Sequence, residues 1–222
     1  MKDHRIAVAA QRRARMRATL MRAGLEVMAE KGIAATSVDD VVRHAEVARG
    51  SFYKYFDGTA ELAEAIGTVI AEEVILGLEE EMTTIVDPAE RLATGITGVL
   101  AMVTANPVLG RFLVRGGWPV DRTGGLLLDK IGGTVAQGID QGRFFPVPMP
   151  VAMALVGGVV LGCAHEISAT AEPKGIIVAA AGTVLRGLGL GPTDAEAIAK
   201  MSRKELKWKE GDFMQCLARQ NR

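Results

Sequence analysis

The stretch TSVDDVVRHAEVARGSFYKYFDGTAEL, residues 36–62, decides the fold expected for this chain. A hydroxyl residue, Thr36 or Ser37, can cap a helix, and two acids follow in the first turn, where the helix dipole favours negative charge. Residues 45–48 interrupt the pattern, and a second short helix is expected over residues 49–56. Two short helices around a four-residue break predict a helix-turn-helix, whose second helix can enter the DNA major groove.

The second helix carries the groups that a DNA-reading helix needs. Small or flexible groups near its start can approach base edges, and hydroxyl or cationic donors around them can hold phosphates. We expect Arg49, Gly50 and Ser51 at the bases. The residues predicted to contact DNA are Thr36, Ser37, Arg49, Gly50, Ser51, Tyr53, Lys54, Tyr55 and Thr59. Phe52 and Phe56 have the spacing of core anchors. An ordinary amphipathic helix with an aromatic core face and a few surface charges is the alternative for this helix taken alone.

The same stretch resembles the tetracycline-repressor (TetR) family of bacterial regulators. The resemblance runs from the capped helix through AEVARGSFYKYF to an acidic-hydrophobic helix beginning near Glu61, and covers about residues 12–64. Two departures affect contact geometry: Glu46 stands where the family usually has Gly, and Thr59 where members often have Lys. The resemblance implies an all-α fold, with an N-terminal three-helix helix-turn-helix DNA-binding head joined to a larger helical ligand-binding and dimerisation body.

Charge is segregated along the chain, although the formal net charge is zero. Residues 1–55 hold eleven Lys or Arg and six Asp or Glu, a net charge of +5, whereas residues 57–90 hold ten acids and no Lys or Arg. The positive segment is the one predicted to bind DNA. Two roles stay open for the arginines near the start of the chain. They can contact phosphates or a neighbouring minor groove, or they can form a solvated helix end: Arg12, Arg13, Arg15 and Arg17.

Helical patterns between Gly and Pro breaks cover the rest of the chain. After an arm over residues 1–11, disordered or partly helical, helices are expected over 12–30, 59–82, 88–105, 107–115, 121–140, 150–169, 173–188 and 193–201. We predict two domains. The head with its basic arm spans residues 1–57, and the effector-binding and dimerisation body spans residues 58–222.

Two of the predicted body helices, 150–169 and 173–188, are too apolar to face water. Residues 144–164 carry no charge, which opens a transmembrane interpretation, but prolines break the start of that segment and glycines dilute it, so a buried helix in a soluble protein is expected. The family resemblance implies that both helices pair with their copies in a second subunit. A monomeric core would have the same composition; we predict the homodimer because two DNA half-sites require two heads.

Motifs for catalysis or metal binding are missing from the sequence. There is no GxSxG, Walker or HExxH pattern, and the first 17 residues are too basic for a signal peptide. Cys163 and Cys216 are far apart, which indicates reduced cytoplasmic thiols and leaves a redox role open. We therefore expect a cytoplasmic protein that is not an enzyme and has no cofactor, no metal and no membrane partner.

The resemblance also implies a small-molecule effector within the body, whose binding changes the separation of the heads and releases DNA. The candidate effector residues, each of which also suits ordinary core packing, are Met102, Leu109, Phe112, Trp118, Phe144, Met153 and His165. Few of them carry charge, so an apolar or amphipathic effector is expected.

Together these features predict a transcriptional regulator. We expect a repressor that binds a pseudo-palindromic double-stranded DNA operator as a homodimer and is released by a small apolar or amphipathic ligand. The alternative is a helical small-molecule-binding protein or enzyme whose head mediates protein contacts.

Overall fold

The structure, a computed structural model, describes residues 2–116, 125–170, 172–202 and 213. Over these residues the chain is all-α, as predicted, and no strand occurs among them. The helices are α1 (Lys2–Lys31), α2 (Val38–His44), α3 (Arg49–Phe52), α4 (Thr59–Met82), α5 (Pro88–Ala105), α6 (Pro107–Gly116), α7 (Gly125–Asp140), α8 (Met149–Ile167), α9 (Pro173–Gly187) and α10 (Pro192–Met201).

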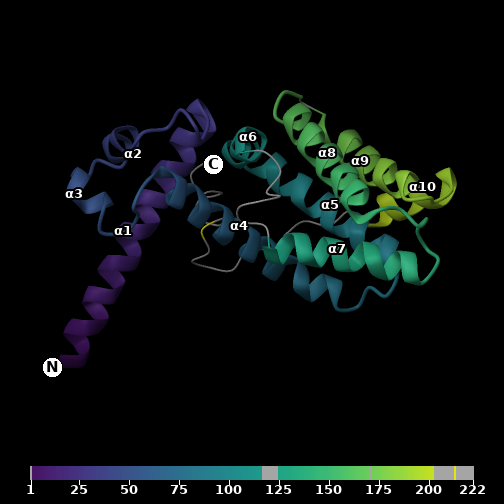
Figure 1. The fold of residues 1–222 in the computed structure, drawn as a ribbon, viewed down its shortest axis with the longest axis horizontal. Helices are drawn as coiled ribbons and strands as arrows, with labels where there is room; N and C mark the ends of the chain where they lie inside the picture. The colour runs from purple at the N-terminus through teal and green to yellow at the C-terminus, as the bar shows by residue number, and fades with distance from the viewer. Residues whose placement is uncertain (1, 117–124, 171, 203–212, 214–222) are drawn as a thin grey trace.

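Helices α1 to α3 form a head at one end of the molecule, and α5 to α10 form a larger body at the other (Figure 1). The head core collects the apolar face of α1, including Leu20 and Met28, the α2 residue Val41, and both phenylalanines of the predicted recognition segment, Phe52 and Phe56. All five side chains are at most 2 % exposed. This burial confirms the core role expected for the two phenylalanines.

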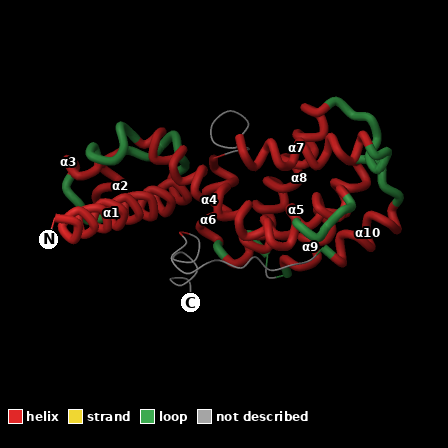
Figure 2. The backbone as a smooth tube through the Cα atoms, turned by 90° about the horizontal axis from the view of Figure 1, so that it is seen from below, coloured by secondary structure: helices red, strands yellow, loops and turns green. Residues whose placement is uncertain are grey.

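Helix α4 runs from the head into the body (Figure 2). Its first turns bury Leu62 and Ile66 in the head core. They cross α1 closely at Gly24, where an added Cβ would lie 2.5 Å from Leu62 Cδ2. A larger residue at this position would therefore force the buried side chain of Leu62 to shift, and glycine permits the close crossing.

The body packs α8, α9 and α10 around the central helix α5. Asp87 caps the start of α5 by accepting a hydrogen bond from the backbone N–H of Ala89, and Pro88 occupies the first turn, where no N–H is needed. Arg143, in the α7–α8 connection, joins this cap to α10 through ion pairs with Asp87 at 3.0 Å and Asp194 at 2.7 Å. These two carboxylates raise the pKa of Arg143.

Helix α6 connects the body back to the head. It bends away from α5 by 118° and packs along α1. Leu109 and Phe112 of α6 are buried in the same cluster as the head residues, together with Met102 of α5. The head core therefore continues into the body, and the boundary predicted at residue 57 stays a prediction.

Two helix boundaries differ from the predictions by more than two residues. Helix α1 begins at Lys2, so residues 2–11, predicted as a separate arm, are its first turns. Helix α3 ends at Phe52 instead of residue 56, because the chain then turns: the backbone N–H groups of Tyr55 and Phe56 both donate to the carbonyl of Phe52. The start of the helix expected from residue 121 lies outside the described residues up to 124.

Helix α8 is the one unbent helix among the described residues that is long and apolar enough to cross a membrane, with a mean hydropathy of 1.6. A third of the tested segment is buried inside the protein, and the core helix of a soluble protein meets the same criteria. This composition is weak evidence for a membrane span.

Candidate DNA interface and effector cavity

The turn between α2 and α3 has the hydrogen bonds of a Schellman motif. The N–H of Val47 donates to the carbonyl of Val42 at 3.0 Å, and the N–H of Glu46 donates to that of Arg43 at 3.3 Å. In this motif the residue after the helix C-cap adopts a left-handed backbone conformation, and that residue here is Glu46, with φ +54°. Glutamate therefore adopts here a backbone conformation that glycine would adopt at lower cost.

The start of α2 is fixed by a capping box. Ser37 accepts a hydrogen bond from the backbone N–H of Asp40, and the Asp40 carboxylate accepts one from the N–H of Ser37. Lys31, the last residue of α1, pairs with the same carboxylate at 2.6 Å. The hydrogen bonds from Lys31 and Ser37 hold the pKa of Asp40 well below its usual range. The end of α1 and the start of α2 are thus tied at one carboxylate.

Arg49, the first residue of α3, is held by neighbours on the head surface. Its Nη1 lies 2.8 Å and 3.0 Å from the carboxylate oxygens of Asp39 on α2, and its Nη2 donates to the Tyr53 hydroxyl at 3.3 Å. The guanidinium also lies over the Tyr53 ring, 5.8 Å from its centroid. Tyr53 and Asp39 together raise the pKa of Arg49. A base or phosphate that binds this guanidinium must compete with Asp39.

Gly50 and Lys54 are exposed on the same short segment. No atom lies within 4 Å of a Cβ added at Gly50, so the protein itself does not require glycine there. Ser51 and Tyr55 are half-buried, as is Thr59 at the start of α4. A small residue beside exposed donors suits close approach of a DNA backbone.

One predicted DNA contact turns inward. Thr36 is buried, and its hydroxyl donates to the carbonyl of Gly32 at 2.8 Å. It therefore supports the loop after α1, and of the two hydroxyls considered as caps it is Ser37, which is exposed, that caps α2.

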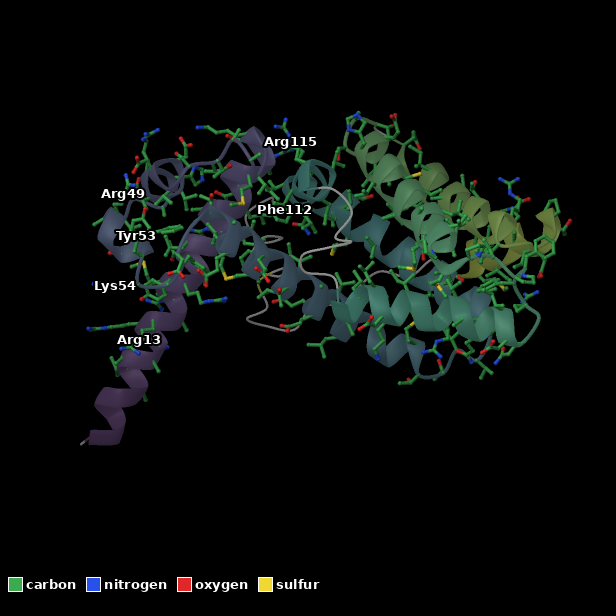
Figure 3. The ribbon with its side chains drawn as sticks, viewed as in Figure 1. Arg13, Arg49, Tyr53, Lys54, Phe112 and Arg115 are labelled. Carbon is green, nitrogen blue, oxygen red and sulfur yellow. The ribbon has the colours of Figure 1, made fainter. Side chains whose placement is uncertain are left out.

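Several basic residues of α1 lie before the part of the helix that packs into the head. Met16 is the first α1 side chain packed against the head core, and Arg12, Arg13 and Arg15 before it are exposed. Arg17 lies over the Phe56 ring, 5.4 Å from its centroid. Arg13, Arg49 and Lys54 lie at the same end of the molecule (Figure 3). The head thus presents basic side chains from two elements at the end that carries α3.

A cavity of about 260 Å³ lies in the body between α4, α5, α7 and α8. Most of its lining is aliphatic. The lining residues are Ile75, Leu78, Met82, Thr83, Arg91, Leu92, Gly95, Ile96, Val99, Leu127, Lys130, Ile131, Thr134, Val156 and Val160.

The effector residues proposed from sequence are not among these lining residues. Met102, Leu109 and Phe112 pack into the head core, and Phe144 is buried in the body core against Gly138. On α8, Met153 is half-buried and His165 is exposed. Trp118 lies outside the described residues. Both phenylalanines among the candidates fill the cores, and mostly aliphatic side chains surround the space that remains. Sequence reasoning missed Arg91 and Gly95, and no local pattern in the sequence marks either residue as lining a cavity.

Comparison with known proteins matches both parts of the chain. The family described as bacterial regulatory proteins, tetR family, matches residues 20–66, and the tetracyclin repressor-like C-terminal domain matches residues 87–201, just over half of the chain. The transcriptional regulator AcuR from Cereibacter sphaeroides is 44% identical over 48 residues. That match covers only 22% of each protein.

Two solved structures share the fold over most of the chain. RolR in complex with resorcinol has a TM-score of 0.60 and 22% identity, and the match covers 86% of this chain and 95% of RolR. FadR from Bacillus subtilis in complex with stearoyl-CoA has a TM-score of 0.62 and 20% identity, covering 78% of this chain and 98% of FadR. With matching models over head and body and the same helical architecture, the chain belongs to the TetR family of bacterial transcriptional regulators.

Proposed function

We propose that this protein is a repressor that binds a pseudo-palindromic operator as a homodimer and leaves it when a small apolar or amphipathic molecule enters the body. The observation that carries the proposal is the helix-turn-helix with its exposed basic surface, joined through α4 and α6 to a body that contains an apolar cavity. It acts by binding rather than catalysis, and in the cytoplasm, where DNA is accessible.

On the head, we assign base contacts to Arg49, Gly50 and Ser51. Ser37, Tyr53, Lys54, Tyr55 and Thr59 anchor phosphates. Arg49 suits guanine, because a guanidinium can donate two hydrogen bonds to the major-groove edge of that base. Asp39 holds this guanidinium in place until DNA replaces the carboxylate. The exposed arginines of α1 extend the phosphate contacts beyond the half-site.

The dimer face lies on α8 and α9. Gly158 and Gly162 on α8 and Gly175 on α9 are exposed, and an added Cβ at each meets no atom within 4 Å. An apolar helix with small residues on its outer face permits close contact with the same helices of a second subunit. This arrangement also covers the part of α8 that is not buried within one chain.

The ligands bound in two related structures support a small-molecule effector. RolR was solved with resorcinol and FadR from Bacillus subtilis with stearoyl-CoA. Pockets for drug-sized ligands are typically about 300–1,000 Å³, so a cavity of about 260 Å³ suits a ligand at or below the small end of that range.

Two measurements test the proposal. Affinity for a generic duplex, measured by fluorescence anisotropy between about 50 and 200 mM salt, should fall steeply as salt rises, because bound phosphates release counterions. Sedimentation should give a dimer that Gly162→Leu disrupts. The matched control Gly133→Leu, at an exposed and open position of α7, should leave the dimer intact. A protein that does not bind duplex DNA at any of these salt concentrations would instead favour a head that binds proteins.

A further inference from the structure

The charged side chains that line the body cavity are all positive among the described residues. Among the described lining residues, those with polar side chains are Thr83, Arg91, Lys130 and Thr134, so both ionisable groups are basic. A half-buried cation such as Arg91 attracts an anionic ligand more strongly than a cation on the open surface does, because less water screens its charge. The cavity therefore favours a ligand with a negative group over a neutral or positive one.

Arg91 has an unmet hydrogen-bonding group. Its Nε is buried and has no hydrogen-bond partner among the described residues. A buried donor without a partner is costly, and in native proteins such a group calls for an explanation, such as strain, a bound water or ion, or a functional role. A guanidinium donates in a fork that matches the two oxygens of a carboxylate. Because water does not reach Nε as the guanidinium lies, Arg91 would turn this donor toward the cavity to receive a carboxylate there.

The helices place these cations beside an apolar space. On α5, Arg91, Gly95 and Val99 recur every four residues and so share one face of the helix. On α7, the lining residues Leu127, Lys130, Ile131 and Thr134 also recur with helical spacing. Arg91 is half-buried, whereas Lys130 is exposed. Lys130 therefore lies at the rim, where it can meet the ligand first, and Arg91 lies further in.

The apolar part of the lining fits a hydrocarbon group. Leu78, Leu92, Ile96, Val156 and Val160 are all buried. Burial of a hydrocarbon chain against such residues contributes about 0.8 kcal/mol per CH₂, which gives affinity without further polar contacts. The lining thus pairs an apolar surface with a cationic end.

We propose that the effector is a small amphipathic anion: a carboxylate bound by Arg91 and Lys130, attached to an apolar body that lies against α5 and α8. This inference rests on the proposed function only for the consequence of binding, release of DNA. The binding itself is a property of the body and can be measured without DNA.

The test compares ligands of equal shape and different charge. Calorimetric titration of the effector-free full-length protein would use hexanoate, octanoate and decanoate, together with the alcohol and the amine of each length. We expect at least one carboxylate to bind about tenfold to a hundredfold more tightly than its alcohol, and the amine to bind most weakly. Equal binding of a carboxylate and its alcohol would overturn the proposal, and so would binding of no carboxylate.

Variants locate the charge that is responsible. Arg91→Met should weaken carboxylate binding about tenfold or more and leave alcohol binding unchanged, and Lys130→Met should have a smaller effect in the same direction. Arg111→Met is the matched control, since Arg111 is exposed on α6 and does not line the cavity. Gly95→Leu, which fills the cavity from α5, should abolish binding of both ligands. Unchanged carboxylate affinity in both Arg91→Met and Lys130→Met would overturn the assignment.

The same preparations separate this inference from the proposed function. Carboxylate binding by a protein that does not bind DNA would support the inference and contradict the repressor. Sequence-specific DNA binding by a protein that shows no preference for carboxylates would support the repressor and overturn the inference.

Discussion

The guanidinium of Arg115, a residue labelled in Figure 3, donates a hydrogen bond to the backbone carbonyl of Glu30. Glu30 lies in the last turn of α1, where carbonyls lack partners within the helix, so a cation from α6 caps the end of α1. The next residue packs at the same junction: a Cβ added at Gly116 would lie 3.2 Å from Ile33 Cδ1. Since α6 follows α5, which lines the cavity, this contact connects the cavity to the head.

Loss of this cap should weaken the coupling between cavity and head. Arg115→Met keeps the apolar stem and removes the donor. We expect the free energy of unfolding to fall by only about 0.5–1 kcal/mol, because water can replace a donor at an exposed carbonyl. The ratio of DNA affinities without and with effector should fall several-fold. Anisotropy titrations with Arg111→Met as control check this, and an unchanged ratio would mean that α4 alone carries the coupling.

Glycine at the helix-turn-helix turn should stabilise the head. Glu46 adopts φ +54°, a conformation that costs a non-glycine residue about 1–2 kcal/mol. Part of the gain is offset by the greater freedom of glycine in the unfolded chain. We expect Glu46→Gly to raise the free energy of unfolding by about 0.5–1 kcal/mol in chemical denaturation, and Glu46→Ala to give none of this gain. Equal effects of the two variants would show that backbone strain is not the cause.

Asp40 should contribute to the acid sensitivity of the head. Its folded pKa is held below the unfolded value near 3.8, so its contribution to stability is fully present above that value and is lost as pH falls through the folded pKa. Asp40→Asn should therefore melt at a lower temperature at pH 7, and the difference from wild type should narrow as pH falls below about 4. Melting curves across pH check this, with Asp129→Asn on the exposed part of α7 as control. A difference that is constant with pH would exclude a role for this carboxylate charge.

Lys54 should bind phosphate without reading sequence. Lys54→Ala should weaken binding to specific and generic duplexes alike, and should reduce the slope of log affinity against log salt by about one unit per subunit. Lys200→Ala, at an exposed position of α10 in the body, is the control and should change neither quantity. If Lys54→Ala changed the preferred sequence and left the salt slope intact, Lys54 would be a base contact.

Gly50 should be required for DNA approach and not for folding. The protein leaves the space around its Cα open, so Gly50→Ala should retain the melting temperature of the wild type. It should lose operator affinity by about tenfold or more, because the methyl group would meet the DNA surface. Gly133→Ala, at an open position of α7, is the control. Full operator affinity in Gly50→Ala would place this position outside the interface.

Local signals made the head predictable from the sequence. The cap at Ser37, the four-residue break and the apolar spacing of Phe52 and Phe56 act over a few residues each, and the structure has all of them. The end of α3 was not predictable in the same way. Side chains after Phe52 suit a helix, but the hydrogen bonds to the Phe52 carbonyl close a turn there instead.

The cavity could not be located from sequence, because it depends on which apolar surfaces fail to meet. Phe144 illustrates the difficulty: it was a candidate for the effector site, yet it packs so closely on α7 that a Cβ at Gly138 would lie 2.1 Å from its ring. Arg91 and Lys130 line the cavity through tertiary packing of α5 and α7, which no local pattern specifies.

The central claim is that two copies of this head read one operator. Selection of the effector-free protein on a random pool of duplexes, at near-physiological salt, tests it most directly. We predict enrichment of an inverted repeat whose half-sites lie about one helical turn apart, and loss of preference at one position of each half-site in Arg49→Ala. Failure to enrich any sequence, from a protein shown to be dimeric and free of ligand, would contradict the account.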